Sequence, residues 1–219
     1  RVGSCIVNPG KFVAIGLNYS DHAAETGAKV PSEPIVFMKA TSSINGPNDD
    51  IEISSNSKKM DWEVELGIVI GRDTKNISEK DAPNHILGYC LINDISEREW
   101  QIEKMGQWVK GKSHDTFGPI GPYLVTQDEI SDINNLNMSL DVNGKRMQTG
   151  NTGTMIFNVF FIVSYLSKYM SLQPGDIITT GTPPGVGMGK KPQVFLKAGD
   201  KMRLSIEHLG EQNSKVVLL

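Results

Sequence analysis

The stretch "MDWEVELGIVIG", residues 60–71, alternates apolar and acidic positions. Successive side chains of a β-strand point to opposite faces. One face of this strand is therefore apolar, and the other carries the carboxylates of Asp61, Glu63 and Glu65. Like charges about 7 Å apart along a strand repel one another unless water or a cation lies between them. The pattern predicts a strand whose acidic face is either solvated or holds a cation.

Related patterns along the chain predict many strands. Short apolar or alternating runs bounded by turn residues are typical of strands, and Asn143-Gly144 between two such runs predicts a hairpin. The predicted strands cover residues 12–16, 35–39, 62–70, 88–93, 123–126, 138–142, 146–148, 176–180 and 202–207.

Helices are expected to be fewer. Apolar residues recur at helical spacing across residues 155–170. Ser96 and Glu99 have the spacing of a capping box, which predicts a helix ending near residue 106, and a short helix is expected over residues 20–27. Several strands precede any long helix. The whole chain, residues 1–219, is therefore predicted to be a single β-dominated α+β domain.

Composition narrows the class of protein. Hydrophobic residues make up 38% of the chain and charged residues 21%, and the formal net charge of −3 provides no basic field for nucleic acid. The longest apolar stretch, residues 155–166, contains Asn158 and Ser164 and is too short for a membrane span. No secretory segment opens the chain, and its two cysteines are expected to be reduced thiols, with one disulfide as the alternative. A cytoplasmic protein is expected.

Candidate metal ligands follow from the acidic strand. The next apolar strand, "GYCLIND", ends in Asp94 just before the predicted capped helix. Glu63, Glu65 and Asp94 together would form an all-oxygen site, which suits Mg²⁺ or another hard cation. The alternative is a solvated strand face together with a helix-capping aspartate, because surface strands often alternate in this way.

Polar residues after Asp94 are candidate ligand-binding groups. Arg98 and Gln101 are three positions apart, so they share one face of the predicted helix, where an arginine can hold a carboxylate. Lys112, in "VKGKSHDTFGP", can lie against a developing negative charge. The alternative for each is an ordinary solvated side chain.

Two further segments carry candidate chemistry. His22 and Glu25 are three apart on the short helix, and such a pair can act as a general base, although it is often structural. Residues 27–34 contain Gly27 and two prolines and predict a movable cover. The Gly-rich "TTGTPPGVGMGK" fits neither a Walker loop nor a dinucleotide loop, but its amides and the Thr182 hydroxyl can bind a carboxylate. Its alternative is a plain surface loop.

The order of these segments is more specific than any one of them. "GLNYSDHAAETG", "DWEVELGIVIG", "INDISEREWQ", "GKSHDTFGP" and "GDIITTGTPPGVG" resemble, in that order, the motifs of the fumarylacetoacetate hydrolase family over about residues 11–205. The resemblance implies a mixed β-sandwich roll that is usually a homodimer and holds Mg²⁺, or Mn²⁺ or Ca²⁺, on three carboxylates. It also implies that the small N-terminal domain of many members is absent from this chain.

The resemblance implies a role for each candidate residue. It implies metal ligands at Glu63, Glu65 and Asp94, catalytic groups at His22, Glu25 and Lys112, and substrate contacts at Arg98, Gln101 and Thr182.

The resemblance also implies an activity. The sequence is similar to bacterial hydrolases of 2,4-diketo-3-deoxy sugar acids such as the L-rhamnonate derivative, to acylpyruvases, and to relatives named ureidoglycolate lyase. The expected reaction is hydrolysis of a carbon–carbon bond in a small 2,4-diketo acid through a metal-bound enolate. Alternatives are oxaloacetate decarboxylation or tautomerisation, 2-hydroxyhepta-2,4-diene-1,7-dioate isomerisation, and a non-catalytic carbohydrate-binding β-sandwich with structural Ca²⁺.

Overall fold

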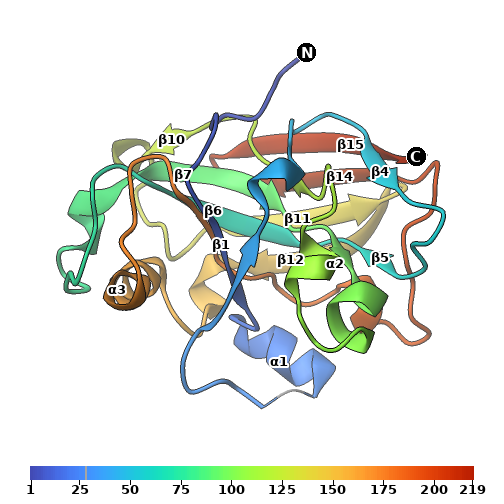
Figure 1. The fold of residues 1–219 in the computed structure, drawn as a ribbon, viewed down its shortest axis with the longest axis horizontal. Helices are drawn as coiled ribbons and strands as arrows, with labels where there is room; N and C mark the ends of the chain where they lie inside the picture. The colour runs from blue at the N-terminus through green and yellow to red at the C-terminus, as the bar shows by residue number, and fades with distance from the viewer. Residues whose placement is uncertain (28) are drawn as a thin grey trace.

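Two β-sheets form the framework of the protein, whose computed structural model describes residues 1–27 and 29–219 (Figure 1). The six-stranded sheet has the order β10-β7-β6-β13-β1-β2, and the five-stranded sheet has the order β12-β11-β14-β15-β4. The pairs β1–β13 and β15–β4 are parallel and the other pairs within these sheets are antiparallel. The predicted β-dominated fold with mixed sheets is therefore confirmed.

The strands of the first sheet are β1 (Phe12–Gly16), β2 (Ile35–Lys39), β6 (Val64–Ile70), β7 (Ile86–Asn93), β10 (Val125–Thr126) and β13 (Ile177–Thr179). Those of the second are β4 (Ile51–Ile53), β11 (Asn137–Val142), β12 (Lys145–Asn151), β14 (Lys201–Ile206) and β15 (Gly210–Leu218). Two short pairs join β3 (Ile44–Asn45) to β9 (Gly118–Pro119) and β5 (Met60–Asp61) to β8 (Ser96–Glu97).

The helices are α1 (Ser20–Thr26), α2 (Val109–Lys112) and α3 (Val159–Tyr169), and η3 (Glu99–Glu103) is a π-helical turn. Short 3₁₀ turns are η1 (Thr41–Ser43), η2 (Ala82–His85), η4 (Gln127–Glu129), η5 (Thr152–Thr154) and η6 (Gly187–Gly189). Within the described residues, none of the helices combines the length and apolar character that crossing a bilayer requires.

The main core lies between the two sheets. Leu66 and Ile68 of β6 and Leu140 and Leu204 of the second sheet are fully buried in one cluster, which α3 also joins through Ile162. Burial of these side chains is the dominant favourable contribution to folding. A second, smaller apolar cluster covers the opposite face of β6 beside the acidic residues.

The central strand β6 is buried on both faces. Its predicted alternation is correct, with Leu66 and Ile68 facing the main core and Glu65 facing the other side. However, Glu63 is only 6% exposed and Glu65 only 2% exposed. The solvated alternative for this acidic face is therefore wrong.

Each predicted strand overlaps an observed one, and the hairpin at Asn143-Gly144 joins β11 to β12 with positive φ at both turn residues. The predicted helix over 155–170 is confirmed as the shorter α3, capped by the Asn158 side chain, which accepts a hydrogen bond from Phe161 N. The short helix over 20–27 is α1, which ends at Gly27 in the left-handed conformation.

The predicted capped helix that begins at Ser96 is wrong. Ser96 and Glu97 pair with β5 as a short strand, and the Ser96 hydroxyl donates to Asp94 O instead of capping a helix. The helical turn η3 begins only at Glu99. Burial of this segment against β5 overrides the local capping signal.

Strand β15 has no counterpart among the predicted strands. Its inward positions include Gln212 and Ser214, so its pattern of buried residues is not an apolar pattern. The buried Gln212 amide donates instead to the carbonyls of Leu91 and Gly121. Buried polar side chains that hydrogen-bond to backbone carbonyls interrupt the apolar alternation by which strands are predicted, so this strand could not be predicted from hydrophobic pattern alone.

Candidate active site

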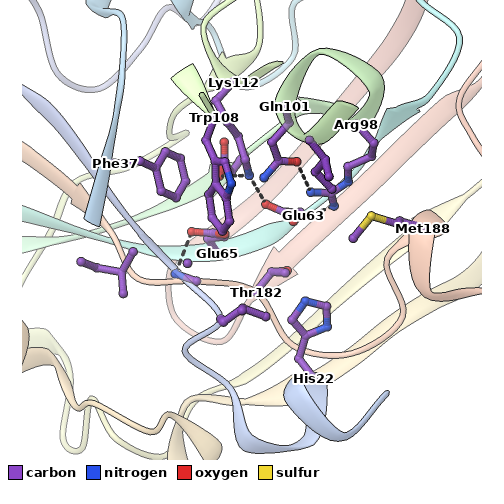
Figure 2. A pocket seen from close by; sticks show the side chains of 16 residues that line it. His22, Phe37, Glu63, Glu65, Arg98, Gln101, Trp108, Lys112, Thr182 and Met188 are labelled. Atoms are coloured by element: carbon purple, nitrogen blue, oxygen red, sulfur yellow. Dashed lines mark hydrogen bonds and ion pairs between the residues drawn. The ribbon is translucent and has the colours of Figure 1, made fainter. Parts of the chain in front are cut away.

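A cavity of about 220 Å³ opens beside the six-stranded sheet, between the ends of β1 and β6 and the segment that carries η3 and α2. Figure 2 shows the side chains that face it. Of the predicted site residues, all but Glu25 line this cavity: His22, Glu63, Glu65, Asp94, Arg98, Gln101, Lys112 and Thr182.

The antiparallel pairing of β6 with β7 brings the three acidic residues together. Val64 at the start of β6 is opposite Asn93 at the end of β7, and Asp94 N donates to Glu63 O at 2.9 Å. Glu63, Glu65 and Asp94 consequently offer carboxylate oxygens that all lie within 4.8 Å of one another. Residues about 30 positions apart in the chain thus form one cluster because of strand register.

Two buried lysines contact this cluster. The Lys112 ammonium lies 2.6 Å from Glu63 Oε2 and 2.5 Å from Asp94 Oδ2. The Lys39 ammonium lies 2.6 Å from Asp94 Oδ1 and also donates to the carbonyl oxygen of Lys112. Burial lowers the pKa of Lys39, and the neighbouring Asp94 charge only partly offsets that effect. Lys39 therefore fixes both Asp94 and the end of α2, which carries Lys112.

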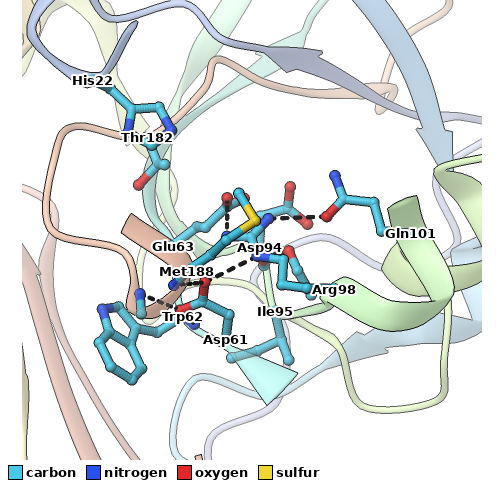
Figure 3. A network of polar contacts seen from close by, with 12 residues as sticks. His22, Asp61, Trp62, Glu63, Asp94, Ile95, Arg98, Gln101, Thr182 and Met188 are labelled. Atoms are coloured by element: carbon cyan, nitrogen blue, oxygen red, sulfur yellow. Dashed lines mark hydrogen bonds and ion pairs between the residues drawn. The ribbon is translucent and has the colours of Figure 1, made fainter. Parts of the chain in front are cut away.

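Arg98 connects the acidic cluster to a second carboxylate. Its Nε lies 2.9 Å from Asp61 Oδ2, its Nη2 lies 2.7 Å from Glu63 Oε1, and its Nη1 donates to Gln101 Oε1 at 3.0 Å (Figure 3). The structure thus brings Arg98 and Gln101 together on one face of η3, as their spacing predicts. Both are about 4% exposed, so neither is a solvated surface residue.

The Gly-rich segment 179–190 binds carboxylates through its backbone, and those carboxylates belong to the protein itself. Asp61 accepts from Gly187 N at 2.6 Å and from Met188 N at 3.0 Å. Glu65 Oε2 accepts from Gly181 N at 2.8 Å, and Glu25 accepts from Gly185 N. Backbone amides aimed at anions are a common use of such loops. Here they fasten the loop to the acidic residues of the site.

The pKa values of Glu63 and Glu65, two positions apart on one strand face, are shifted in opposite directions. Burial alone would raise the pKa of Glu63, but the charges and hydrogen bonds of Arg98 and Lys112 outweigh burial and hold that pKa well below its usual range. Burial raises the pKa of Glu65 well above its usual range, and the charges of Asp94 and Glu63 add to the effect. Glu65 accepts hydrogen bonds from Thr179 Oγ1 and Gly181 N, but among the described residues it forms no ion pair with a lysine or arginine.

The donor set fits a hard divalent cation. Four buried carboxylates, those of Asp61, Glu63, Glu65 and Asp94, face three buried cationic side chains, those of Lys39, Arg98 and Lys112. Among the described residues no His or Cys belongs to this cluster, and oxygen-only sites suit Mg²⁺, Mn²⁺ or Ca²⁺. Among the described residues Glu65 forms no ion pair, whereas Glu63 and Asp94 do, so a cation held by these three carboxylates would provide Glu65 with a positive partner.

His22 faces the cavity, and Glu25 lies behind it. The distance from His22 Nδ1 to Glu25 Oε2 is 3.4 Å, and Glu25 is anchored by Gly185 N at 3.0 Å. His22 projects into the cavity from the side opposite Glu63 (Figure 2). The His22 imidazole can therefore act as a proton acceptor in the cavity, with the Glu25 carboxylate beside it but outside the cavity lining. The predicted cover over residues 27–34 includes Ala28, which lies outside the described residues.

Thr182 lies at the edge of the cavity with its hydroxyl committed to the protein. The hydroxyl donates to Val64 O at 2.9 Å and accepts from Gln148 Nε2 at 2.8 Å. These bonds hold the Gly-rich segment against the start of β6. A ligand can therefore reach this hydroxyl oxygen only through its remaining lone pair.

Several residues in or beside the cavity were not among the site residues predicted from the sequence. Asp61 was visible as the third acid of the alternating strand, and Lys39 as a charged residue at the end of an apolar strand. Phe37 and Trp108, which also line the cavity, had no distinguishing sequence signal. Their placement depends on the packing of β2 against α2, which is a tertiary contact.

Comparison with known proteins agrees with this architecture. A profile of the fumarylacetoacetate (FAA) hydrolase C-terminal family matches residues 11–217. The chain belongs to the fumarylacetoacetate hydrolase family. It is therefore an enzyme of a superfamily whose solved members are named both as hydrolases and as isomerases.

Individual relatives of the family are similar over most of their length. A Burkholderia cenocepacia protein provisionally named a hydrolase is 62% identical over 213 residues, which is 97% of this chain and 76% of the relative. Fumarylacetoacetate hydrolase from psychrophilic Exiguobacterium antarcticum has a TM-score of 0.90 at 38% identity, covering 96% of this chain and 76% of the other. The 2-hydroxyhepta-2,4-diene-1,7-dioate isomerase from Mycobacterium marinum has a TM-score of 0.87 at 38% identity, covering 100% and 78%.

Proposed function

We propose that this protein hydrolyses a carbon–carbon bond in a 2,4-diketo acid. One observation carries the proposal. The carboxylate cluster of Glu63, Glu65 and Asp94 lies across the cavity from His22, which Glu25 supports from outside the cavity (Figure 2). A cluster that could hold a cation and a proton acceptor are thus separated by the space in which a small substrate would lie.

The proposed reaction consumes one water molecule. The hydroxyl of water adds to C4 of the diketo acid, and the bond between C3 and C4 breaks with its electron pair retained by C3. A proton is returned to C3. The products are a carboxylic acid that keeps the tail and a pyruvate anion, so atoms and charges balance.

The buried polar residues hold the 2-oxo acid end. A divalent cation on Glu63, Glu65 and Asp94 would supply Lewis-acid polarisation of that end when bound. Arg98 is held by Asp61 and Glu63, and it binds Gln101 Oε1, which turns the Gln101 amide nitrogen towards the cavity (Figure 2). Arg98 and Gln101 orient the carboxylate of the substrate.

His22 moves the proton. Its imidazole removes a proton from the attacking water, and the Glu25 carboxylate at 3.4 Å stabilises the resulting imidazolium. The same imidazolium returns a proton to C3 after bond cleavage. The Lys112 ammonium, held by Glu63 and Asp94, stabilises the negative charge that develops on the 2-oxo acid end.

A second candidate is isomerisation or decarboxylation at the same site. The solved isomerase from Mycobacterium marinum, at 38% identity, favours it. Those reactions use the same oxo-acid end but need no attacking water, so the demand on the His22–Glu25 pair differs.

The test is a panel of acylpyruvates and other 2,4-diketo acids, with oxaloacetate and 2-hydroxyhepta-2,4-diene-1,7-dioate as competing substrates. The expected result is release of pyruvate from a diketo acid, lost with EDTA and restored by Mg²⁺. Turnover of the competing substrates alone would favour the second candidate. Binding of 2-oxo acids without any turnover would instead indicate a non-catalytic binding protein.

A further inference from the structure

The lining of the cavity is of two chemical kinds. Besides the carboxylates and cationic groups described above, it includes a set of apolar side chains, called here the apolar wall: Ile15, Leu17, Phe37, Ile102, Trp108 and Met188. Phe37 and Trp108 lie on the Lys112 side of the acidic residues, and Met188 lies near Arg98 (Figure 2). The apolar wall is the surface available to the part of the substrate beyond the oxo-acid end.

Phe37 and Trp108 form the centre of the apolar wall. Their ring centroids are 5.2 Å apart with an interplanar angle of 63°, an edge-to-face contact. The Lys112 ammonium lies 5.1 Å from the centroid of the Phe37 ring. The aromatic surface therefore begins beside the charged end, where the carbons of the tail would leave the reacting centre.

The backbone of β1 is adapted to this wall. A Cβ atom at Gly16 would lie 2.5 Å from Cζ3 of Trp108, so the indole can approach the strand only because residue 16 has no side chain. The next residue, Leu17, lines the cavity with a φ of 50°, in the left-handed region that leucine rarely adopts. Strained backbone of this kind tends to be retained at functional sites.

The cationic side chains of the lining are already engaged. Arg98 binds Asp61 and Glu63, and Lys112 binds Glu63 and Asp94. Among the residues that line the cavity no further Lys or Arg is available for a carboxylate at the far end of a substrate. Lys190, in the nearby Gly-rich segment, donates to Met147 O and does not line the cavity.

We infer that the substrate tail is a short, uncharged, apolar acyl group and that Trp108 and Phe37 set this specificity. The inference rests on the proposed function, because it assigns the tail of the same diketo acid. A second carboxylate or a polyol would lose hydration against the apolar wall without gaining partners, which costs binding free energy. The cavity volume of about 220 Å³ is below the roughly 300–1,000 Å³ of drug-sized ligand sites, so the tail is short.

Binding measurements test the tail independently of turnover. The probes are 2-oxohexanoate and 2-oxoadipate, which have equal chain length and end in a methyl group or a carboxylate, measured by calorimetry with the Mg²⁺-loaded protein. We expect 2-oxohexanoate to bind at least about tenfold more tightly, and affinity to rise about fourfold per methylene from 2-oxobutanoate until the cavity is filled. Equal or tighter binding of 2-oxoadipate would overturn the inference.

Turnover separates the two proposals. Hydrolysis of carboxylate-ended diketo acids in preference to apolar ones would overturn the tail inference and leave the proposed function standing. Absence of hydrolysis with every diketo acid, together with tighter binding of the apolar 2-oxo acids, would overturn the proposed function and support the apolar tail.

Variants of the wall locate the specificity. Trp108→Ala is expected to reduce the affinity ratio between 2-oxohexanoate and 2-oxobutanoate by about tenfold, whereas Trp108→Phe keeps most of it. Met105→Ala is the control, because Met105 is apolar, 89% exposed and in the same segment but outside the cavity. An unchanged ratio in both Trp108 variants would overturn the role of the indole, and thermal unfolding establishes that each variant is folded.

Discussion

The ammonium of Lys39 lies 2.6 Å from Oδ1 of Asp94, and both side chains are almost completely buried. The two residues come from β2 and from the end of β7, which are not adjacent strands of the sheet. Because Asp94 also receives Lys112 at 2.5 Å, the Lys39 contact positions a carboxylate that belongs to the candidate metal cluster.

Replacing Lys39 with Met should lower the free energy of unfolding by about 3–5 kcal/mol, because removing one partner of a buried ion pair leaves the other uncompensated. Lys59→Met is the control, since Lys59 pairs with Glu103 at the surface and its loss should have little effect on the free energy of unfolding. Denaturant titrations of both variants provide the comparison. Similar losses in the two would mean that the Lys39 pair contributes no more than a surface contact.

Replacing Glu63 or Asp94 with Ala should abolish both cation binding and turnover, and Asp94→Asn should weaken both while preserving side-chain shape. The physical reason is that, in the proposed site, each of the three carboxylates would be a ligand of one hard cation. Titration with Mg²⁺ or Mn²⁺ by calorimetry gives the affinity directly. Glu211→Gln, at an exposed ion pair with Arg203, should leave it unchanged. Cation affinity in Asp94→Asn equal to that of the unmodified protein would remove Asp94 from the ligand set.

Glu25→Gln should lower the rate of diketo acid hydrolysis by about 10²- to 10⁴-fold, the usual contribution of general base catalysis, with cation affinity unchanged. The amide cannot stabilise a charged His22 as the carboxylate does. Decarboxylation of oxaloacetate should decline less, because it needs no attacking water. Steady-state rates on both substrates decide the matter, and an unchanged hydrolysis rate would show that this pair is not the base.

Asp61→Asn should raise the KM for 2-oxo acids by roughly tenfold while cation affinity stays the same. Asp61 does not line the candidate active-site cavity but accepts from Arg98 Nε, Gly187 N and Met188 N, so its charge positions the arginine and the Gly-rich segment. A parallel loss of cation affinity would show that Asp61 acts on the metal cluster as well.

Hydrophobic alternation was sufficient to predict the central strands. Strand β6 has one apolar face and one acidic face, and this arrangement survives in the fold. The same reasoning failed at β15, where Gln212 and Ser214 point inward, and at Ser96, where pairing with β5 displaced a capping signal. In these cases long-range contacts outweigh the local preference of the residues.

The polar residues that line the candidate site could be predicted from the sequence, but the hydrogen bonds and ion pairs that connect them could not. Nothing local indicates that Lys39 reaches Asp94 or that the amides of the Gly-rich segment bind Asp61 and Glu25. Those contacts join segments separated by 55 to 160 positions, and they follow from sheet order and register.

The placement of Glu65 and Leu66 on opposite faces of β6 also guards against misfolding. A slip of one residue along β7 would push the Glu65 carboxylate between the two sheets and turn Leu66 outward. Burying that carboxylate among aliphatic side chains without partners is costly, so the mispaired chain is penalised far more than an uncharged strand would be. The Glu65 carboxylate, a candidate metal ligand, therefore also favours the correct register between β6 and β7.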